Sequence, residues 1–215
     1  MLHLLVELRI QLWKEFGYSM STVLIFSLVG FGLFTAEHSG ITLIYHKIEE
    51  FGIWYLIFSL LVMIVYHDFY FYWTHRLMHY KLFFRHVHKV HHESTNPSPW
   101  AAYSFHPWEA LIQALVLPIA AFIIPLHPLI IFIFLTHMIL RNVMGHLGFE
   151  ILPKGFTQNK WFSWNTSITH HNMHHNHFNS NYGLYFSWWD NLMKTTHAQY
   201  HETFEEVKAR PKPVS

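Results

Sequence analysis

The chain has 215 residues, a length that suits one domain, and only 13% of them are charged while 52% are hydrophobic. Its net charge of +1, with no basic tract, argues against a nucleic-acid partner. The absence of cysteine excludes disulfides, thiolate metal sites and a cysteine nucleophile. The exceptional residue is histidine, which occurs 21 times in this apolar chain and needs an explanation.

The N-terminal part predicts two helices in succession. Leucine recurs at positions 2, 5, 8 and 12, so residues 1–18 are expected to form an amphipathic helix lying on the membrane. A charge-free apolar run from Ser19 to Ala36 follows, and it predicts a first membrane span. Acidic residues precede this run and no small-residue cleavage site follows it, so we interpret it as a span and not as a signal peptide.

Three further apolar stretches predict three further spans. The second covers about residues 51–66 and continues as an aromatic helix through His79. The third covers 108–125, with Pro118 as an expected kink, and the fourth covers 128–144. A tight turn between Pro125 and Pro128 makes the last two spans a hairpin. The sequence therefore predicts an all-α integral membrane protein with four spans in two hairpins; the alternative is a soluble protein with buried core helices.

The distribution of basic residues predicts the orientation. With four spans, both termini, the 67–107 segment and everything after Met144 share one side, and only Lys47 among the lysines and arginines lies opposite. The positive-inside rule places that side in the cytoplasm. We expect one membrane domain over 1–215, with the spans in 19–145, a cytosolic histidine-rich cap over 146–200 and a polar tail over 201–215.

Four groups of histidines lie on the side expected to be cytoplasmic. T-H-R-L-M-H holds two histidines four residues apart, and H-K-V-H-H and H-N-M-H-H each repeat an i, i+3, i+4 pattern. A single histidine ends the fourth span in N-V-M-G-H-L-G. The first two groups lie between spans two and three. The nine candidate ligands are His75, His79, His88, His91, His92, His146, His171, His174 and His175.

Their spacing is typical of metal binding. Neutral imidazole is a ligand for iron, zinc and copper, and helical i, i+3 or i, i+4 spacing points two rings at one ion. One ion uses at most about five or six protein nitrogens, so nine converging histidines predict two ions, each with a position left for O₂ or water. A lone histidine is more often an interfacial or hydrogen-bonded residue, and we interpret His127 and His201 in that way.

Three polar residues are candidates to support the ligands. Asp68 precedes His75 by seven residues on the same helix face, and either accepts a ring N–H or pairs with an arginine at the water boundary. Glu109 either orients a ligand or caps the helix that it begins. Asn142, one turn before His146, is expected to hydrogen-bond into the site.

From about Asp68 to Thr195 the chain resembles the fatty acid hydroxylase superfamily, which includes sterol desaturases, sterol methyl oxidases, fatty-acyl 2-hydroxylases and carotenoid hydroxylases. The resemblance rests on D-F-Y-F-Y-W-T-H-R-L-M-H, F-R-H-V-H-K-V-H-H-E-S, H-P-W-E, N-V-M-G-H-L-G and H-H-N-M-H-H-N-H-F-N-S-N-Y-G. It implies four spans, a cytosolic cap and two metal ions held by the nine histidines. Some branches have a further histidine where this chain has Asn142, which leaves His106 or water as a substitute tenth ligand. In the last motif, His170 competes with His171 for the ligand register.

The resemblance implies a non-haem di-iron enzyme that uses O₂ to hydroxylate an unactivated C–H bond of a fatty acyl, sterol or isoprenoid lipid. Desaturation on the same scaffold is the alternative; membrane metal transport and haem electron transfer are more remote. Zinc is a possible substitute for iron in purified protein. A separate ferredoxin, or a small cytochrome with its reductase, is expected to supply electrons. We expect the lipid to pass Phe105, Trp108 and His137, and the protein to reside in a bacterial inner membrane rather than in the endoplasmic reticulum.

Overall fold

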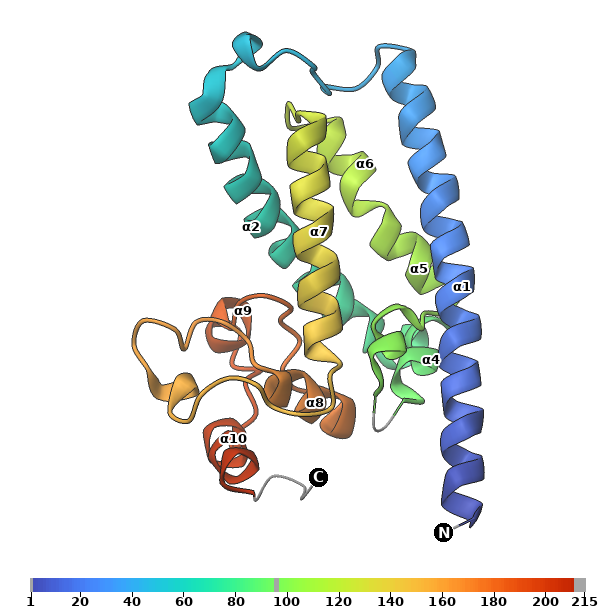
Figure 1. The fold of residues 1–215 in the computed structure, drawn as a ribbon, viewed down its shortest axis with the longest axis vertical. Coiled ribbons are helices and arrows are strands. Elements are labelled where there is room, and N and C mark those ends of the chain that lie inside the picture. Colours follow the sequence, from blue (N-terminus) through green and yellow to red (C-terminus); the bar gives the residue numbers. More distant parts are fainter. Residues whose placement is uncertain (1, 95–96, 211–215) are drawn as a thin grey trace.

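The computed structural model describes residues 2–94 and 97–210, and throughout these ranges the regular structure is helical (Figure 1). The prediction of an all-α protein is confirmed for this part of the chain. The α-helices are α1 Leu2–His38, α2 Gly52–Met78, α3 Lys81–Phe83, α4 Lys89–His92, α5 Pro107–Ala114, α6 Val116–Ala121, α7 Pro128–Gly145, α8 Ile168–His177, α9 Trp188–Leu192 and α10 Tyr200–Ala209.

Helix α1 is one continuous helix, which corrects the prediction of a separate amphipathic helix over residues 1–18. No proline interrupts residues 2–38, and the leucines near the N-terminus favour helix as strongly as the apolar run that follows. The stretch Val6–His38 is long and apolar enough to cross a membrane. The expected boundary near residue 18 is therefore absent.

Two more helices, α2 and α7, are long and apolar enough to cross a bilayer. Both expose large apolar side chains that water would not favour: Trp54 is 81% exposed and Phe132 is 69% exposed. Helix α7 begins with Pro128 at its first position, and the His127 ring accepts a hydrogen bond from the Leu129 N–H at 3.1 Å. Three candidate spans with lipid-like surfaces make the chain a membrane protein.

The expected third span is broken into α5 and α6, and Pro107–Ala121 is shorter than the roughly 20 residues of a full crossing. Proline has no N–H, so Pro118 cannot bond to the carbonyl of Ala114, and α5 ends at Ala114. The interruption at Leu115, about one turn before Pro118, agrees with the predicted kink, while the prediction of one full-length third helix is wrong.

Helices α1, α2, α5–α6 and α7 run side by side, and their loops meet at the end opposite to α8, α9 and α10 (Figure 1). There the loop after α1 bonds to the turn after α6: Leu43 N–H donates to Ala121 O at 2.8 Å and Tyr45 N–H donates to Leu126 O at 3.1 Å. Below this junction the buried core joins α2, α6 and α7. Its members are Leu56, Met63, Ala120, Leu126, Ile130 and Phe134.

The C-terminal segment forms a layer of short helices under the bundle (Figure 1). Helix α10 corrects the prediction of a polar tail over 201–215, because residues through Ala209 are helical and Phe204 is fully buried. Its first residue, Tyr200, donates a hydrogen bond to Ser167 Oγ at 3.0 Å, next to the start of α8. The rest of the expected tail, residues 211–215, lies outside the described residues.

Candidate metal centre

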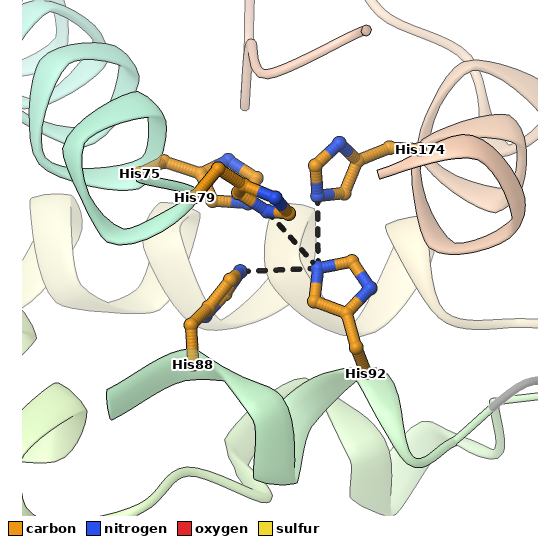
Figure 2. A group of neighbouring side chains, drawn as sticks. All are labelled: His75, His79, His88, His92 and His174. Carbon is orange, nitrogen blue, oxygen red and sulfur yellow. Dashed lines mark hydrogen bonds between the residues drawn. The ribbon is translucent and has the colours of Figure 1, made fainter. Parts of the chain in front are cut away.

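All nine candidate ligands come together where α2, α4, α7 and α8 converge, and they form two groups whose ligand atoms lie within 4.8 Å of one another. We call them the five-histidine group and the four-histidine group. The five-histidine group contains His75, His79, His88, His92 and His174 (Figure 2). The four-histidine group contains His91, His146, His171 and His175.

Helical spacing divides the second and third histidine motifs, H-K-V-H-H and H-N-M-H-H (the second and third boxes), between the two groups. Both histidines of the first box, T-H-R-L-M-H, belong to the five-histidine group. Pairs four residues apart share a group, as His88 and His92 do in the second box and His171 and His175 do in the third. The histidine between them, at i+3, belongs to the other group, as His174 does. The two groups are therefore adjacent, and the rings of His92 and His175 have centroids 4.7 Å apart.

The ring nitrogens of the five-histidine group converge on His92 (Figure 2). Its Nε2 atom lies 3.1 Å from His79 Nε2, 3.2 Å from His88 Nε2 and 3.1 Å from His174 Nε2. In the four-histidine group, His171 Nε2 lies 2.9 Å from His146 Nε2 and 3.1 Å from His175 Nε2. An octahedral ion with bonds of roughly 2.1 Å holds adjacent nitrogens about 3 Å apart, so both groups have metal-site dimensions.

Hydrogen bonds donated by Nδ1 show that the Nε2 atoms facing the middle of the five-histidine group carry unprotonated lone pairs. His75 Nδ1 donates to Tyr182 O at 2.9 Å and His174 Nδ1 donates to Ser180 O at 2.7 Å, so the Nε2 atom of each neutral ring is left without a proton. His75 Nε2 is buried and has no hydrogen-bond partner. Lone pairs that converge without a donor repel one another, and a cation between them removes this cost. The residues present therefore fit a bound metal ion.

Burial keeps these rings neutral. Burial first, and neighbouring imidazoles second, hold the pKa values of His91, His171 and His174 well below the ordinary value for histidine. Burial also lowers the pKa of His146 to about 4. A neutral imidazole is the form that binds metal, so the cluster needs no deprotonation before it binds ions at neutral pH.

Two other candidate ligand rings donate hydrogen bonds from Nδ1 to a nearby side chain or main-chain oxygen. Glu109 is 1% exposed, and its Oε1 atom accepts a hydrogen bond from His88 Nδ1 at 2.7 Å. We expected Glu109 either to orient a ligand or to cap its helix, and the structure shows it in contact with a candidate ligand. His146 Nδ1 donates to the main-chain oxygen of Asn142 at 2.8 Å. Such partners fix the tautomer and orientation of a ligand ring.

The first of the two alternatives for Asp68, a hydrogen bond from a ligand ring, is not found among the described residues. Its Oδ1 atom accepts hydrogen bonds from the N–H groups of Tyr185 and Phe186, at 3.0 and 3.1 Å. The ring of His75 instead uses the carbonyl of Tyr182. Successive backbone N–H groups attract a carboxylate, so Asp68 fastens the 185–186 backbone to α2.

The side-chain amide of Asn142 donates to a main-chain oxygen and not to a candidate ligand, which differs from our expectation. Its Nδ2 atom donates to the carbonyl of Ala102 at 2.6 Å. Only its main-chain oxygen contacts a candidate ligand, His146. That contact depends on helix geometry and not on the asparagine side chain.

Neither additional ligand candidate belongs to a histidine group. The ring of His106 accepts a hydrogen bond from Trp108 N–H at 3.3 Å and caps α5. His170 is fully buried, and its Nε2 atom lies 3.3 Å from Asp190 Oδ2. The competition in the third box therefore favours His171, while His170 has an acidic partner of its own.

The sequence analysis missed Asp190 and the loop of residues 180–183. Asn-Tyr-Gly at 181–183 is a turn signal, but no side-chain pattern indicates that main-chain oxygens of this loop will face two ligand rings. Asp190 lies in W-W-D-N, outside the histidine boxes. Only the three-dimensional arrangement connects it with the site.

A cavity adjoins the two groups on the side of the long helices. It is lined by residues from α1, α2, α5 and α7 and from the loops beside them, including Phe26, His67, Phe71, Phe105 and Met138. Two of these rings also contact candidate ligands: the Phe71 centroid lies 5.0 Å from that of His75, and Phe105 lies 5.3 Å from His91. We expected the lipid to pass Phe105, Trp108 and His137, and of these three only Phe105 lines this cavity. Trp108 is 61% exposed.

Comparisons with known proteins agree with the site. The fatty acid hydroxylase family model matches residues 60–195. The chain is 33% identical over 185 residues to Delta(7)-sterol 5(6)-desaturase ERG3B of Gibberella zeae, covering 86% of this chain and 55% of the relative. It is 32% identical over 190 residues to lathosterol oxidase of Rattus norvegicus, and 30% identical over 190 residues to that of Homo sapiens; each match covers 86% of this chain and 61% of the relative.

The chain thus spans a little over half the length of these curated relatives. No solved structure gives a significant match. The relatives are eukaryotic and lend no support to the expectation of a bacterial membrane. Because the family model covers more than half of the chain, including all nine candidate ligands, this protein belongs to the fatty acid hydroxylase family.

Proposed function

We propose that this chain is an O₂-dependent lipid desaturase whose two histidine groups each hold one iron ion. The observation that carries the proposal is the pair of adjacent, buried groups of neutral imidazoles at the base of the apolar helices. Iron bound there would supply O₂ activation and C–H cleavage, chemistry that amino-acid side chains do not provide. Zinc in purified protein would bind the same ligands without this redox chemistry.

From the sequence we expected hydroxylation, but we now prefer desaturation. The similar proteins are named sterol desaturases or lathosterol oxidase, and these names favour our alternative. We therefore propose a sterol-like polycyclic lipid as substrate. Removing two hydrogens as an alkene forms supplies two electrons, and reduction of O₂ to two waters needs four. The remaining two electrons come from an external one-electron donor, which we propose is a ferredoxin or a small cytochrome with its reductase.

The side chains around the small cavity beside the site suggest where the substrate is held. Its wall is largely aromatic, with Phe26, Phe71 and Phe105 among its side chains, and it adjoins the bilayer-sized helices. At about 20 Å³ the cavity is the size of one water molecule, so these side chains would move apart before a rigid apolar lipid could contact them with one ring edge facing the histidine groups. The bound lipid would also exclude water from the site.

The proposed topology has four crossings. Helices α5 and α6 together accompany α7 to the far end of the bundle, although neither is long enough to cross alone (Figure 1). Apart from Lys47 and Arg141, which lies within α7, all the lysines and arginines would then lie on the side of the metal site, which the positive-inside rule places in the cytoplasm. The layer of α8, α9 and α10 would be a cytosolic cap.

The test is lipid analysis of cells that express either the wild-type chain or His174→Ala, with a Δ7 sterol supplied. Desaturation predicts a product two hydrogens lighter than the substrate, present only with the wild type. A product heavier by one oxygen would favour hydroxylation. Identical lipid profiles from both proteins, expressed at equal levels with an electron donor present, would contradict an oxidative role on this lipid.

A further inference from the structure

The loop of residues 180–183 holds two ligand rings of the five-histidine group through its main chain. The carbonyl of Ser180 accepts from His174 Nδ1 at 2.7 Å, and the carbonyl of Tyr182 accepts from His75 Nδ1 at 2.9 Å. These ligands belong to α8 and α2, which are far apart in the sequence. One short loop therefore sets the tautomer and direction of two rings that face the same ion position.

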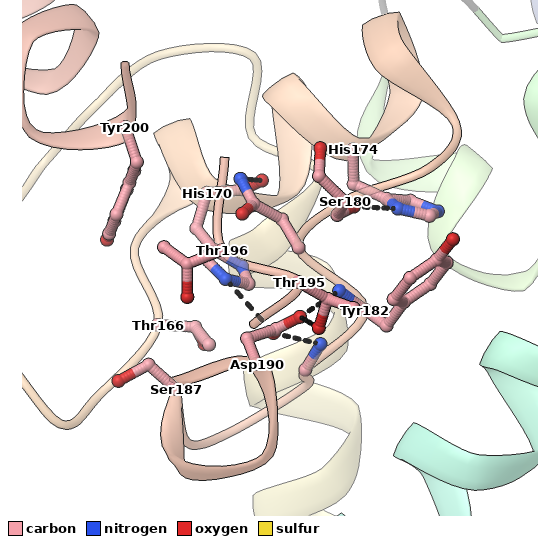
Figure 3. Close-up of polar contacts among 12 residues, drawn as sticks. Thr166, His170, His174, Ser180, Tyr182, Ser187, Asp190, Thr195, Thr196 and Tyr200 are labelled. Atoms are coloured by element: carbon pink, nitrogen blue, oxygen red, sulfur yellow. Dashed lines mark hydrogen bonds and ion pairs between the residues drawn. The ribbon is translucent and has the colours of Figure 1, made fainter. Parts of the chain in front are cut away.

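Asp190 fastens this loop with both carboxylate oxygens (Figure 3). Oδ1 accepts hydrogen bonds from Tyr182 N–H at 2.9 Å and Thr195 Oγ1 at 2.7 Å, and Oδ2 accepts one from Gly183 N–H at 2.8 Å. Tyr182 thus donates its main-chain N–H to Asp190, while its carbonyl oxygen accepts a hydrogen bond from the ring of His75. Asp190 is fully buried, so no water competes for these bonds.

Gly183 permits the close approach of this carboxylate. A Cβ atom at position 183 would lie 2.9 Å from Asp190 Oδ2 and 2.5 Å from the main-chain oxygen of Phe186. Both distances are too short for carbon and oxygen atoms. The loop therefore has the one residue type that lets the backbone reach the acid.

His170 connects the same acid to α8. Its Nε2 atom lies 3.3 Å from Asp190 Oδ2, and its main-chain oxygen accepts a hydrogen bond from Asn181 Nδ2 at 3.1 Å (Figure 3). His170 is four residues before His174, so the two lie one turn apart on α8. The acid, the loop and the ligand-bearing helix are therefore joined in one buried network.

We propose that Asp190 is a positioning residue for the ion of the five-histidine group, with His170 as its partner. The inference rests on the proposed metal centre and adds a distinction between its two ions. In the four-histidine group, His146 is held by the carbonyl of Asn142 on its own helix and not by the 180–183 loop. Loss of the Asp190 contacts therefore weakens one ion selectively.

The test is Asp190→Asn in the full chain, reconstituted anaerobically with ferrous iron and equilibrated with a chelator at set free-metal levels. The amide keeps the size of the acid but turns an NH₂ group towards one of its donors. We expect wild type to hold two ions per chain, and the variant to hold one with unchanged affinity and the other about 10–100-fold more weakly. Glu205→Gln is the matched control: that carboxylate accepts a hydrogen bond from Gly155 N–H at 2.8 Å and belongs to neither histidine group, so both ions should stay.

Two further variants make the result decisive. His171→Ala alters the four-histidine group, so His171→Ala combined with Asp190→Asn should lose the ion that Asp190→Asn alone holds with unchanged affinity. The double variant should keep only the weakened ion. Thr195→Val removes one donor to Asp190 and should weaken the same single ion by a smaller factor, which keeps the test valid if Asp190→Asn does not fold.

Each result supports or overturns a specific statement. If wild type and Glu205→Gln bind no pair of ions, the proposed metal centre fails. If wild type binds two ions but Asp190→Asn, or Thr195→Val in its place, weakens both equally or neither, the metal centre stands and the positioning role of Asp190 is wrong.

Discussion

Replacing Glu109 by glutamine tests whether a buried carboxylate supports the metal through a ligand ring. Glu109 is 1% exposed and its Oε1 atom accepts from His88 Nδ1 at 2.7 Å, within the five-histidine group. The amide oxygen of Glu109→Gln can still accept this hydrogen bond, but the carboxylate that makes the ring a stronger donor of its Nε2 lone pair is lost. Loss of such a partner costs about 10–100-fold in metal affinity, or about 1.4–2.7 kcal/mol.

The assay is retained iron per chain across a series of chelator-buffered free-metal concentrations, with circular dichroism to check the helices. Glu109→Ala should weaken binding further, because His88 Nδ1 is then buried without an acceptor. Glu205→Gln serves as the control on α10, away from the histidine groups. A folded Glu109→Gln protein with wild-type affinity for both ions would refute the reasoning.

Three other predictions concern single positions. His88→Ala should abolish turnover while His86→Ala, an exposed histidine two residues away, leaves it unchanged in an assay of lipid product; equal effects would contradict the ligand assignment. Gly183→Ala should lower the free energy of unfolding by about 1–3 kcal/mol in thermal denaturation, because its Cβ would clash with main-chain oxygen; an unchanged melting temperature would show that the loop yields freely. Single cysteines at Ser39 and His86, in a chain without other cysteines, should react with a membrane-impermeant maleimide from opposite sides; labelling from one side would exclude four crossings.

The ligands could be found from the sequence because their spacing is dictated by helix geometry. Histidines four residues apart lie on one helix face, and this holds before any tertiary contact is known. The division between ions was not visible in the same pattern. His91 and His92 are adjacent in sequence yet belong to different groups, because neighbouring side chains on a helix diverge by about 100°.

The support of the ligands was predicted less well, because it uses main-chain atoms. Asp68 has the spacing of a partner for His75, but the loop after α8 brings the Tyr182 carbonyl to that ring and gives Asp68 two N–H donors instead. Carbonyl oxygens carry no signature in the sequence. Glu109 was an even choice between cap and partner until α5 was placed next to His88.

The ends of the chain show a similar limit. Charged residues near position 201 indicated a polar tail, but Tyr200, Phe204 and Val207 lie on one face of a short helix that packs near α8. Residues 1–18 have an amphipathic pattern that did not reveal where the helix ends. Local patterns predicted helix in one case and missed it in the other, because helix length depends on what lies against each face.

The most direct test of the central claim is the metal content of protein purified from iron-replete cells, measured together with its optical spectrum. The account predicts close to two iron ions per chain, no Soret band, and loss of bound iron when His146 or His75 is replaced by alanine. A haem spectrum would contradict the account, and so would a metal content near zero in folded protein reconstituted with ferrous iron.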